Sequence, residues 1–212
     1  MKRIVFWFDV ISPFAYLAFE RLPQALEGCS YEVQYRPVLF AGLLNHWGQK
    51  GPAEVEPKRA WTFRHVAWLA HQHQIPMQTP ASHPFSPLAL LRLALAACEA
   101  GDTPNRRVVE LLMHHVWRGG SDANDAARLV ALTEAVAPVR DPRGEEVKAQ
   151  LRTLTERAVA EGVFGVPTFE LDRRQFWGLD ALPMLRAALQ DEAWFAGPDW
   201  QAAGQPRAGV KR

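Results

Sequence analysis

The chain has 212 residues, of which 48% are hydrophobic and 22% are charged, and its formal net charge at pH 7 is +1. These values are typical of a globular protein that forms one large domain or a domain with an insertion. The nearly neutral chain contains no basic block that could neutralise a row of phosphates, so we expect no nucleic-acid partner.

The sequence also argues against membrane, disulfide and metal-binding classes. No stretch approaches the ~20 apolar residues of a spanning helix, and the run Ile4–Phe8 is too short for the core of a signal peptide. We therefore expect a cytoplasmic protein with no membrane partner. Cys29 and Cys98 lie far apart without a Cys-x-x-Cys motif, and the histidines have no cysteine or carboxylate neighbours at ligand spacing. Two free cysteines and no metal site are expected.

The first 38 residues predict a β-α-β unit. Residues 4–10 are nearly continuously apolar, which indicates a strand covered on both faces. Pro13 suits the first position of a helix, because its φ is fixed and its missing N–H is not needed there. The helix is predicted to end near Gly28, and the β-rich segment Tyr31–Val38 is predicted to be a second strand.

From Phe40 the pattern becomes helical and stays so to about residue 161. A loop with several Gly and Pro residues is predicted at 45–57. Apolar residues at helical spacing, with Gly or Pro near the ends, then predict helices over residues 58–74, 88–100, 105–118, 126–137 and 145–161.

Strand signals return near the C-terminal end. Gly165–Leu171 and the short segment 175–177 flank a turn and predict a hairpin. A final helix is predicted over 181–189, with Asp180 as its N-cap. The chain after Pro198 is expected to be loosely ordered.

The order of these elements predicts the fold class. A β-α-β half, a block of helices and a β-β-α half describe a thioredoxin-like α/β fold with a large α-helical domain inserted between the two halves. We assign residues 1–39 and 162–212 to the discontinuous thioredoxin-like domain and residues 40–161 to the inserted domain.

Three short segments could carry chemistry, and each has a simpler structural interpretation. Ser12 stands where a nucleophile or the partner of a thiolate would lie, but a serine there also commonly just caps the helix. Pro167, at the start of a strand, is either a cis-proline that exposes the backbone of Val166 to a peptide-like ligand or an ordinary trans residue. The step from Gly178 to Asp180 can bind an anion and an ammonium group, or only begin a helix.

Taken together, these segments resemble a known family. The resemblance rests on four motifs spread over residues 3–190: Ser12-Pro13-Phe14-x-Tyr16-Leu17-Ala18, Lys58-x-x-Trp61, Phe164-Gly165-Val166-Pro167-Thr168 and Trp177-Gly178-x-Asp180. They look like the 2-hydroxychromene-2-carboxylate isomerase family. That family is similar to the kappa-class glutathione transferases and, more remotely, to DsbA-like disulfide oxidoreductases.

The resemblance implies glutathione as the cofactor. It implies that Ser12 is the catalytic residue, with a hydroxyl that donates to the glutathione thiolate. It implies that the backbone of Val166, before a cis-Pro167, pairs with the cysteinyl part, and that Asp180 meets the γ-glutamyl ammonium group. The full set implied to bind glutathione is Ser12, Pro13, Phe14, Gln49, Lys58, Val166, Pro167, Leu179 and Asp180, with Lys58 near the glycine carboxylate.

The chain departs from the family pattern at several positions. Ala15 stands where many relatives have Ser, Trp61 where Tyr is common, and Gln49 where Asn is frequent. The last two departures concern the motif positions of Gln49 and Lys58, and the motif that contains Ser12 departs only at Ala15. The tetrapeptide that begins at Ser12 also lacks both cysteines of a Cys-x-x-Cys motif, so dithiol exchange by the chain itself is excluded.

Aromatic residues suggest where a substrate would bind. We expect four of them to wall a pocket for an aromatic substrate between the two lobes: Trp7, Phe40, Trp47 and Trp61.

Three functions fit the sequence. The first is a glutathione-dependent isomerase of the 2-hydroxychromene-2-carboxylate type, which acts on an intermediate of aromatic-ring degradation by reversible thiolate addition. The second is a kappa-like transferase that conjugates glutathione to electrophiles. The third is a non-catalytic thioredoxin-like binding module. The resemblance also implies a homodimer.

Overall fold

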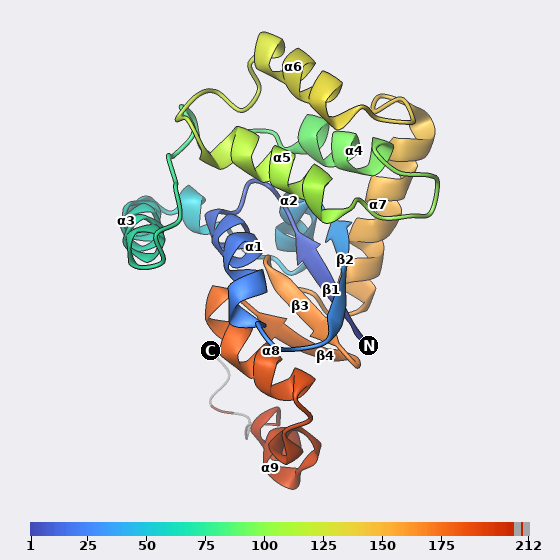
Figure 1. Cartoon of the computed structure of the whole chain (residues 1–212). Helices are drawn as coiled ribbons and strands as arrows, with labels where there is room; N and C mark the ends of the chain where they lie inside the picture. The colour runs from blue at the N-terminus through green and yellow to red at the C-terminus, as the bar shows by residue number, and fades with distance from the viewer. Residues whose placement is uncertain (206–208, 210–212) are drawn as a thin grey trace.

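The computed structural model describes residues 1–205 and 209, and Figure 1 shows its elements. Three of them form the N-terminal β-α-β unit: β1 (Lys2–Phe8), α1 (Pro13–Ala25) and β2 (Tyr31–Pro37). The C-terminal half supplies β3 (Thr168–Leu171), β4 (Arg174–Trp177), a 3₁₀ turn η2 (Leu179–Ala181) and α8 (Leu182–Leu189). Both halves therefore have the predicted element order.

The two halves share one sheet. In the described residues its strand order is β2-β1-β3-β4, with β1 parallel to β2 and antiparallel to β3. Phe6 at the centre of β1 lies between Tyr35 of β2 and Phe169 of β3. The central position of β1 explains its continuous apolar sequence, because a central strand is buried on both faces.

Helices occupy the chain between β2 and β3. They are α2 (Phe40–His46), the 3₁₀ turn η1 (Pro52–Glu54), α3 (Glu56–Gln72), α4 (Leu88–Ala96), α5 (Arg106–Trp117), α6 (Ala126–Val136) and α7 (Glu145–Ala160). In Figure 1, α4, α5 and α6 lie together above the sheet, α7 runs beside β2, and α3 stands out beside α1. None of the helices in the described range is both long and apolar enough to span a membrane.

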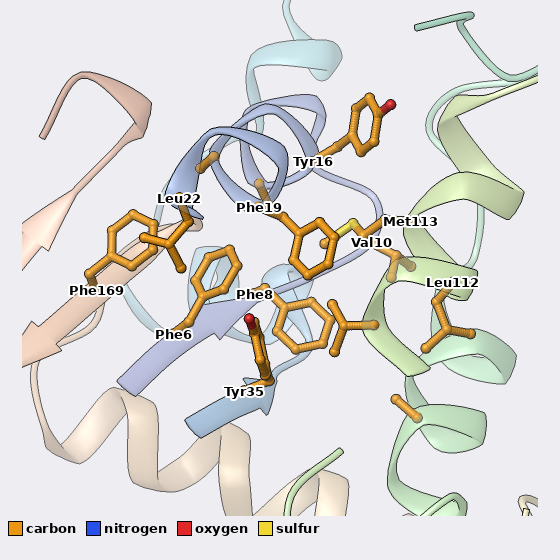
Figure 2. Close-up of a cluster of buried hydrophobic side chains, with 14 of the residues drawn as sticks. Phe6, Phe8, Val10, Tyr16, Phe19, Leu22, Tyr35, Leu112, Met113 and Phe169 are labelled. Carbon is orange, nitrogen blue, oxygen red and sulfur yellow. The ribbon is translucent and has the colours of Figure 1, made fainter. Parts of the chain in front are cut away.

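The core runs from the sheet into the helical block. Phe6 stacks on Phe169 with 4.7 Å between ring centroids, and α1 covers this face of the sheet (Figure 2). The same cluster continues to Leu112 and Met113 of α5. Because the helical block and the sheet share this apolar cluster, the block fixes the position of the elements that carry the site.

The opposite face of the sheet has a smaller cluster. Val5 and Trp7 alternate with the residues of the first face, and they pack with Leu43, Ala158 and Val163. This period-2 alternation places Trp7 under α7 and away from solvent, with no exposed surface.

The structure corrects several element boundaries. The segment 45–57 is only partly a loop, because it includes the end of α2, the turn η1 and the first residues of α3. Helix α4 ends at Ala96 rather than near residue 100. Asp180 is not the N-cap of the last predicted helix, because the turn η2 comes first and Ala181 takes the N-cap position of α8.

The C-terminal segment is also more structured than expected. It forms η3 (Ala193–Ala196) and α9 (Pro198–Ala203). Trp200 packs on Phe195 and Phe176, with ring centroids 5.2 and 6.4 Å away, and this aromatic contact ties the segment to β4. The expectation of loose order therefore fails up to Ala203, and residues 206–208 and 210–212 lie outside the described residues.

Candidate functional site

Ser12 lies at the turn between β1 and α1. It is the N-cap of α1, and its Oγ accepts a hydrogen bond from the amide of Ala15 at 3.2 Å. The same hydroxyl donates to the carbonyl oxygen of Val166 at 3.3 Å. Ser12 therefore caps α1, and it also contacts the segment that precedes β3.

Val166 and Pro167 form this second segment, and the peptide bond between them is cis. The carbonyl of Pro167 accepts from the amide of Gly178 at 2.9 Å, which fixes the entry to β3 against the end of β4. The amide N–H of Val166 donates to no group among residues 1–205 and 209. An extended ligand passing Ser12 would therefore find a free backbone donor there.

Gly165 is needed for this geometry. A Cβ at this position would lie 2.7 Å from Nε1 of Trp177, so only glycine lets the indole pack over the backbone beside Val166. Trp177 in turn packs on Phe164, with 5.0 Å between ring centroids.

Two cavities meet at this point. The first, which we call the Ser12 cavity, has a volume of about 620 Å³ and is lined by Ser12 and by residues of α2, α3 and the segment 83–87. The second, which we call the α8 cavity, has a volume of about 650 Å³ and lies between α1, α3 and the start of α8. Phe14, Val166 and Trp177 line both cavities. A ligand that lies along Val166 would therefore extend into each of them.

The Ser12 cavity has aromatic walls. Its rings come from Phe14, Phe40, Phe63, Phe85, Phe164 and Trp177. Such walls suit a flat apolar molecule.

Asp9 borders the Ser12 cavity at the end of β1. Its side chain has no exposed surface and accepts from the amides of Ile11 at 3.0 Å and Phe40 at 2.9 Å. Burial raises the pKa of Asp9 to about 7, although these two hydrogen bonds act in the opposite direction. Asp9 thus ties the start of α2 to the turn that carries Ser12.

His83 contributes a second titratable group to this cavity. Its Nε2 lies 2.9 Å from the carbonyl oxygen of Ile11, so Nε2 carries the proton and donates. Its Nδ1 is buried and has no hydrogen-bond partner within the described part of the chain. Burial lowers the pKa of His83, so the ring is neutral near pH 7. It packs edge-on against Phe63, with 5.1 Å between ring centroids.

The α8 cavity is richer in charge. Asp180 is exposed within η2, and its carboxylate folds back over Gly178, where a Cβ would clash with it. The cationic side chains of Arg21 and Arg186 also line this cavity. Arg186 also donates to the carbonyl oxygens of Ala25 and Glu27 at 3.0 and 2.7 Å, which fixes its guanidinium at the end of α1.

The structure brings most of the predicted glutathione-binding residues together. Those that line one or both cavities are Ser12, Pro13, Phe14, Gln49, Val166, Pro167, Leu179 and Asp180. Lys58, on the first turn of α3, is exposed and lines neither cavity.

The predicted aromatic substrate wall needs correction. Of its four residues only Phe40 lines the Ser12 cavity. Trp7 is buried under α7, Trp47 donates from Nε1 to the carbonyl of Val163 at 3.0 Å, and Trp61 is 66% exposed on α3. The physical reason is that sheet alternation and helix rotation, and not aromatic content, decide which side chains face the cavity.

Comparison with known proteins agrees with this fold. A family model described as a DSBA-like thioredoxin domain matches residues 3–190. The chain belongs to the DSBA-like thioredoxin family. It is 31% identical over 200 residues to a 2-hydroxychromene-2-carboxylate isomerase of Sphingobium xenophagum, which covers 90% of this chain and 99% of that protein.

Two further relatives of this DSBA-like chain are informative. The kappa 1 glutathione S-transferase of Rattus norvegicus is 26% identical and covers 91% of this chain and 92% of its own. A solved structure of a 2-hydroxychromene-2-carboxylate isomerase superposes with a TM-score of 0.77 at 21% identity, over 93% of this chain and 98% of that one. The fold class and the resemblance to the 2-hydroxychromene-2-carboxylate isomerase family are confirmed.

This DSBA-like protein presents a hydroxyl group at the start of α1. Ser12 and Ala15 stand at the two ends of the tetrapeptide that begins the helix, and neither is a cysteine. Cys29 and Cys98 are both free thiols. Neither cysteine lines the Ser12 cavity or the α8 cavity, so neither supplies a sulfur atom beside Ser12 in this structure.

Sequence reasoning missed several residues of the two cavities. Asp9 and His83 border the Ser12 cavity, and Arg21, His65, His73 and Arg186 line the α8 cavity. Asp9 carried a usable signal, since a lone carboxylate directly after a buried strand must find backbone donors. The arginine and histidine residues of the α8 cavity gave no usable sequence signal, because such residues on a helix are most often exposed to solvent.

Proposed function

We propose that this protein is a glutathione-dependent isomerase of the 2-hydroxychromene-2-carboxylate type, acting on an intermediate of aromatic-ring degradation. The observation that carries the proposal is the contact between the Ser12 hydroxyl and Val166 at the junction of a charged cavity and an aromatic one. One cavity suits a zwitterionic peptide and the other suits an aromatic substrate.

The residues of the α8 cavity fit glutathione. Glutathione is a small peptide with one ammonium group and two carboxylates, so it needs backbone pairing, an anion and cations. The unpaired amide of Val166 offers backbone pairing, Asp180 offers the carboxylate, and Arg21 offers a cation. The contact of Lys58 with the glycine carboxylate and the contact of Gln49 with glutathione stay predictions.

The N-terminus of α1 would activate the thiol. Glutathione, when bound, would supply a thiolate whose addition to the conjugated side chain turns a double bond into a single bond that can rotate, and whose elimination restores the double bond and the thiol. Ser12 would donate a hydrogen bond to that sulfur in place of the 3.3 Å hydrogen bond to the carbonyl of Val166. The partial positive charge at the start of α1 lowers the pKa of a thiol beside it. The aromatic walls of the Ser12 cavity keep water away from the reacting atoms.

The direct test is isomerisation of 2-hydroxychromene-2-carboxylate, followed by absorbance with and without glutathione. We expect turnover only in the presence of glutathione, with the thiol regenerated. Absence of turnover with glutathione present would reject the substrate assignment.

A kappa-like transferase is the second candidate, and the similarity to kappa 1 glutathione S-transferases favours it. It would use the same residues but form a stable conjugate with an electrophile such as chlorodinitrobenzene. A non-catalytic binding module would instead show no thermal shift with glutathione and no effect of Ser12→Ala in any assay.

We propose further that the protein acts as a homodimer in the cytoplasm. Trp61 and Trp68 are 66% and 56% exposed on α3, and exposed apolar side chains close together on one helix suit an interface with a second copy of the chain. Light scattering measures the mass of the particle in solution. A mass of one chain at all concentrations would reject the dimer, and cell fractionation tests the compartment.

A further inference from the structure

A third cavity lies on the far side of α2 from the Ser12 cavity. It has a volume of about 490 Å³, and we call it the α7 groove because α7 forms its longest wall. Helices α2 and α4 form its other walls. In the region where Figure 1 shows α7 beside β2, α2 and α7 approach closely: a Cβ at Gly42 would lie 2.9 Å from the methyl group of Thr155. The groove is thus built by packed helices rather than by a loop.

Most of the charged side chains that line the groove are cationic. The groove is lined by Arg92 of α4 and by Lys148 and Arg152 of α7. Lys148 and Arg152 are one helical turn apart. Glu156, one further turn along α7, is the carboxylate among its lining residues. His46 of α2 completes the polar rim.

Glu145 is a carboxylate close to these cations, and Lys148, Arg152 and Arg92 together lower its pKa. Lys148 pairs with the exposed carboxylate of Glu145 at 2.7 Å. Within residues 1–205 and 209, neither Arg92 nor Arg152 forms an ion pair. The groove therefore holds two guanidinium groups whose charge is not balanced by a direct partner.

Arg92 gives the most specific observation. Its Nε is buried and has no hydrogen-bond partner in the part of the chain that the structure describes. A buried donor without an acceptor is unfavourable, and a guanidinium group presents its donors in a fork that matches a carboxylate. The Nε of Arg92 therefore lacks an acceptor within the described part of the chain.

The floor of the groove is apolar. Leu88, Leu151 and Val159 line it alongside the cations. An inorganic anion such as phosphate would leave these side chains uncovered, whereas a small molecule with an apolar body would cover them.

We propose that the α7 groove is a binding site for a small organic carboxylate, with the carboxylate on Arg92 and Arg152 and the apolar body on Leu88 and Leu151. This site is separate from the Ser12 cavity, because α2 lies between them: Phe40 and Leu44 face the Ser12 cavity, and Gly42 and His46 face the groove. The proposal does not depend on the proposed reaction.

The test uses benzoate as the probe, with benzamide and inorganic phosphate as matched compounds. Methyl NMR of the full chain reports where the probe binds, because Leu88, Leu151 and Val159 lie in the groove and Leu44 lies in the Ser12 cavity. We expect benzoate to shift the groove methyl signals, and benzamide and phosphate to bind at least about tenfold more weakly.

Two variants test the cations separately. Arg152→Gln changes an exposed residue and should weaken benzoate binding about tenfold without affecting folding. Arg92→Met removes the unpaired donor, so it should weaken binding to a similar extent while leaving the melting temperature unchanged or higher. Arg107→Gln, at an exposed position on α5 outside the groove, should bind benzoate like the wild type.

Three results would overturn the proposal. Equal binding of benzamide would show that the cations are not used, and equal binding of phosphate would show that the apolar floor is not used. Benzoate shifts that survive Arg152→Gln and Arg92→Met unchanged would place the molecule elsewhere.

Discussion

The Ser12 cavity and the α8 cavity meet at Val166, yet they differ in how the chain builds them. We call residues 1–39 and 162–212 the thioredoxin-like frame. The α8 cavity takes charged residues from both of its segments, such as Arg21 and Asp180. The Ser12 cavity takes three of its six rings, Phe40, Phe63 and Phe85, from the helical block between β2 and β3. The frame thus supplies charged groups to one cavity, and the helical block supplies half of the aromatic wall of the other.

Helix α3 shows this division within one element. Thr62 and Phe63 face the Ser12 cavity, whereas His65, Leu69 and His73 face the α8 cavity. The two faces are separated by the rotation of the helix, so single substitutions on α3 can address each cavity separately.

The largest expected effect concerns Asp9, on the Ser12 side. Its folded pKa is about 7 against an ordinary value of 3.8, so between these values the folded state binds a proton that the unfolded state has released. Asp9 therefore reduces stability as pH rises from about 4 to 7, by on the order of 4 kcal/mol. The pKa of His83 is lowered, which gives the opposite slope below its ordinary value of 6.5.

Urea unfolding of wild type and Asp9→Asn at several pH values measures this effect. We expect the wild type to lose stability relative to the variant as pH rises from 5 to 8. Comparing the two proteins removes the contribution of the histidines. Parallel curves for the two proteins would contradict the assignment of the raised pKa to Asp9.

The next effect concerns Ser12 at the junction of the cavities. Ser12→Ala should cost about 1 kcal/mol of stability through the lost cap, and should lower glutathione-dependent turnover about a hundredfold through the lost hydroxyl donor. Asn105→Ala is the matched control, because Asn105 caps α5 by accepting from the amide of Val108 at 3.0 Å.

Unfolding and turnover of the two variants separate the roles of Ser12. A similar loss of stability in both, with turnover lost only in Ser12→Ala, supports catalysis. Equal turnover in Ser12→Ala and Asn105→Ala would reduce Ser12 to a helix cap.

The strands and turns of the thioredoxin-like frame could be predicted from the sequence because the signals for them are local. Ser12 follows a buried strand and precedes a helix-starting proline, and Val166 and Pro167 precede the next strand, so position along the chain fixes position in the sheet. Asp180 was placed on the right segment but wrongly as an N-cap, because a 3₁₀ turn cannot be told from the first turn of a helix by residue type.

The packing of the helical block could not be predicted as fully from the sequence. Its apolar periodicity predicted most of the helices, but periodicity only says that a face is covered and not what covers it. Trp61 and Trp68 follow helical spacing and are nevertheless exposed, while Phe63 between them faces the Ser12 cavity. His83 lies in a segment with no periodicity, so nothing in the sequence linked it to the carbonyl of Ile11.

A smaller effect is expected at Asp180, which tests the charged cavity alone. Asp180→Asn should weaken glutathione binding about tenfold, because the ammonium group loses an ionic partner, while turnover at saturating glutathione stays unchanged. Calorimetric titration with glutathione measures the affinity. Glu146→Gln, which removes an exposed carboxylate from the first turn of α7, is the control. A lower turnover number with unchanged affinity would place Asp180 in the reaction rather than in binding.

The smallest effect compares the two faces of α3 directly. Phe63→Leu shortens the aromatic wall of the Ser12 cavity and should raise KM for the aromatic substrate roughly fivefold, with glutathione affinity unchanged. Leu69→Ala shortens the wall of the α8 cavity and should do the reverse, weakening glutathione and sparing KM for the substrate. Steady-state kinetics at varied concentrations of each ligand measures both constants. If both substitutions changed both constants alike, the two cavities would act as one pocket, and the division between frame and helical block would have no functional meaning.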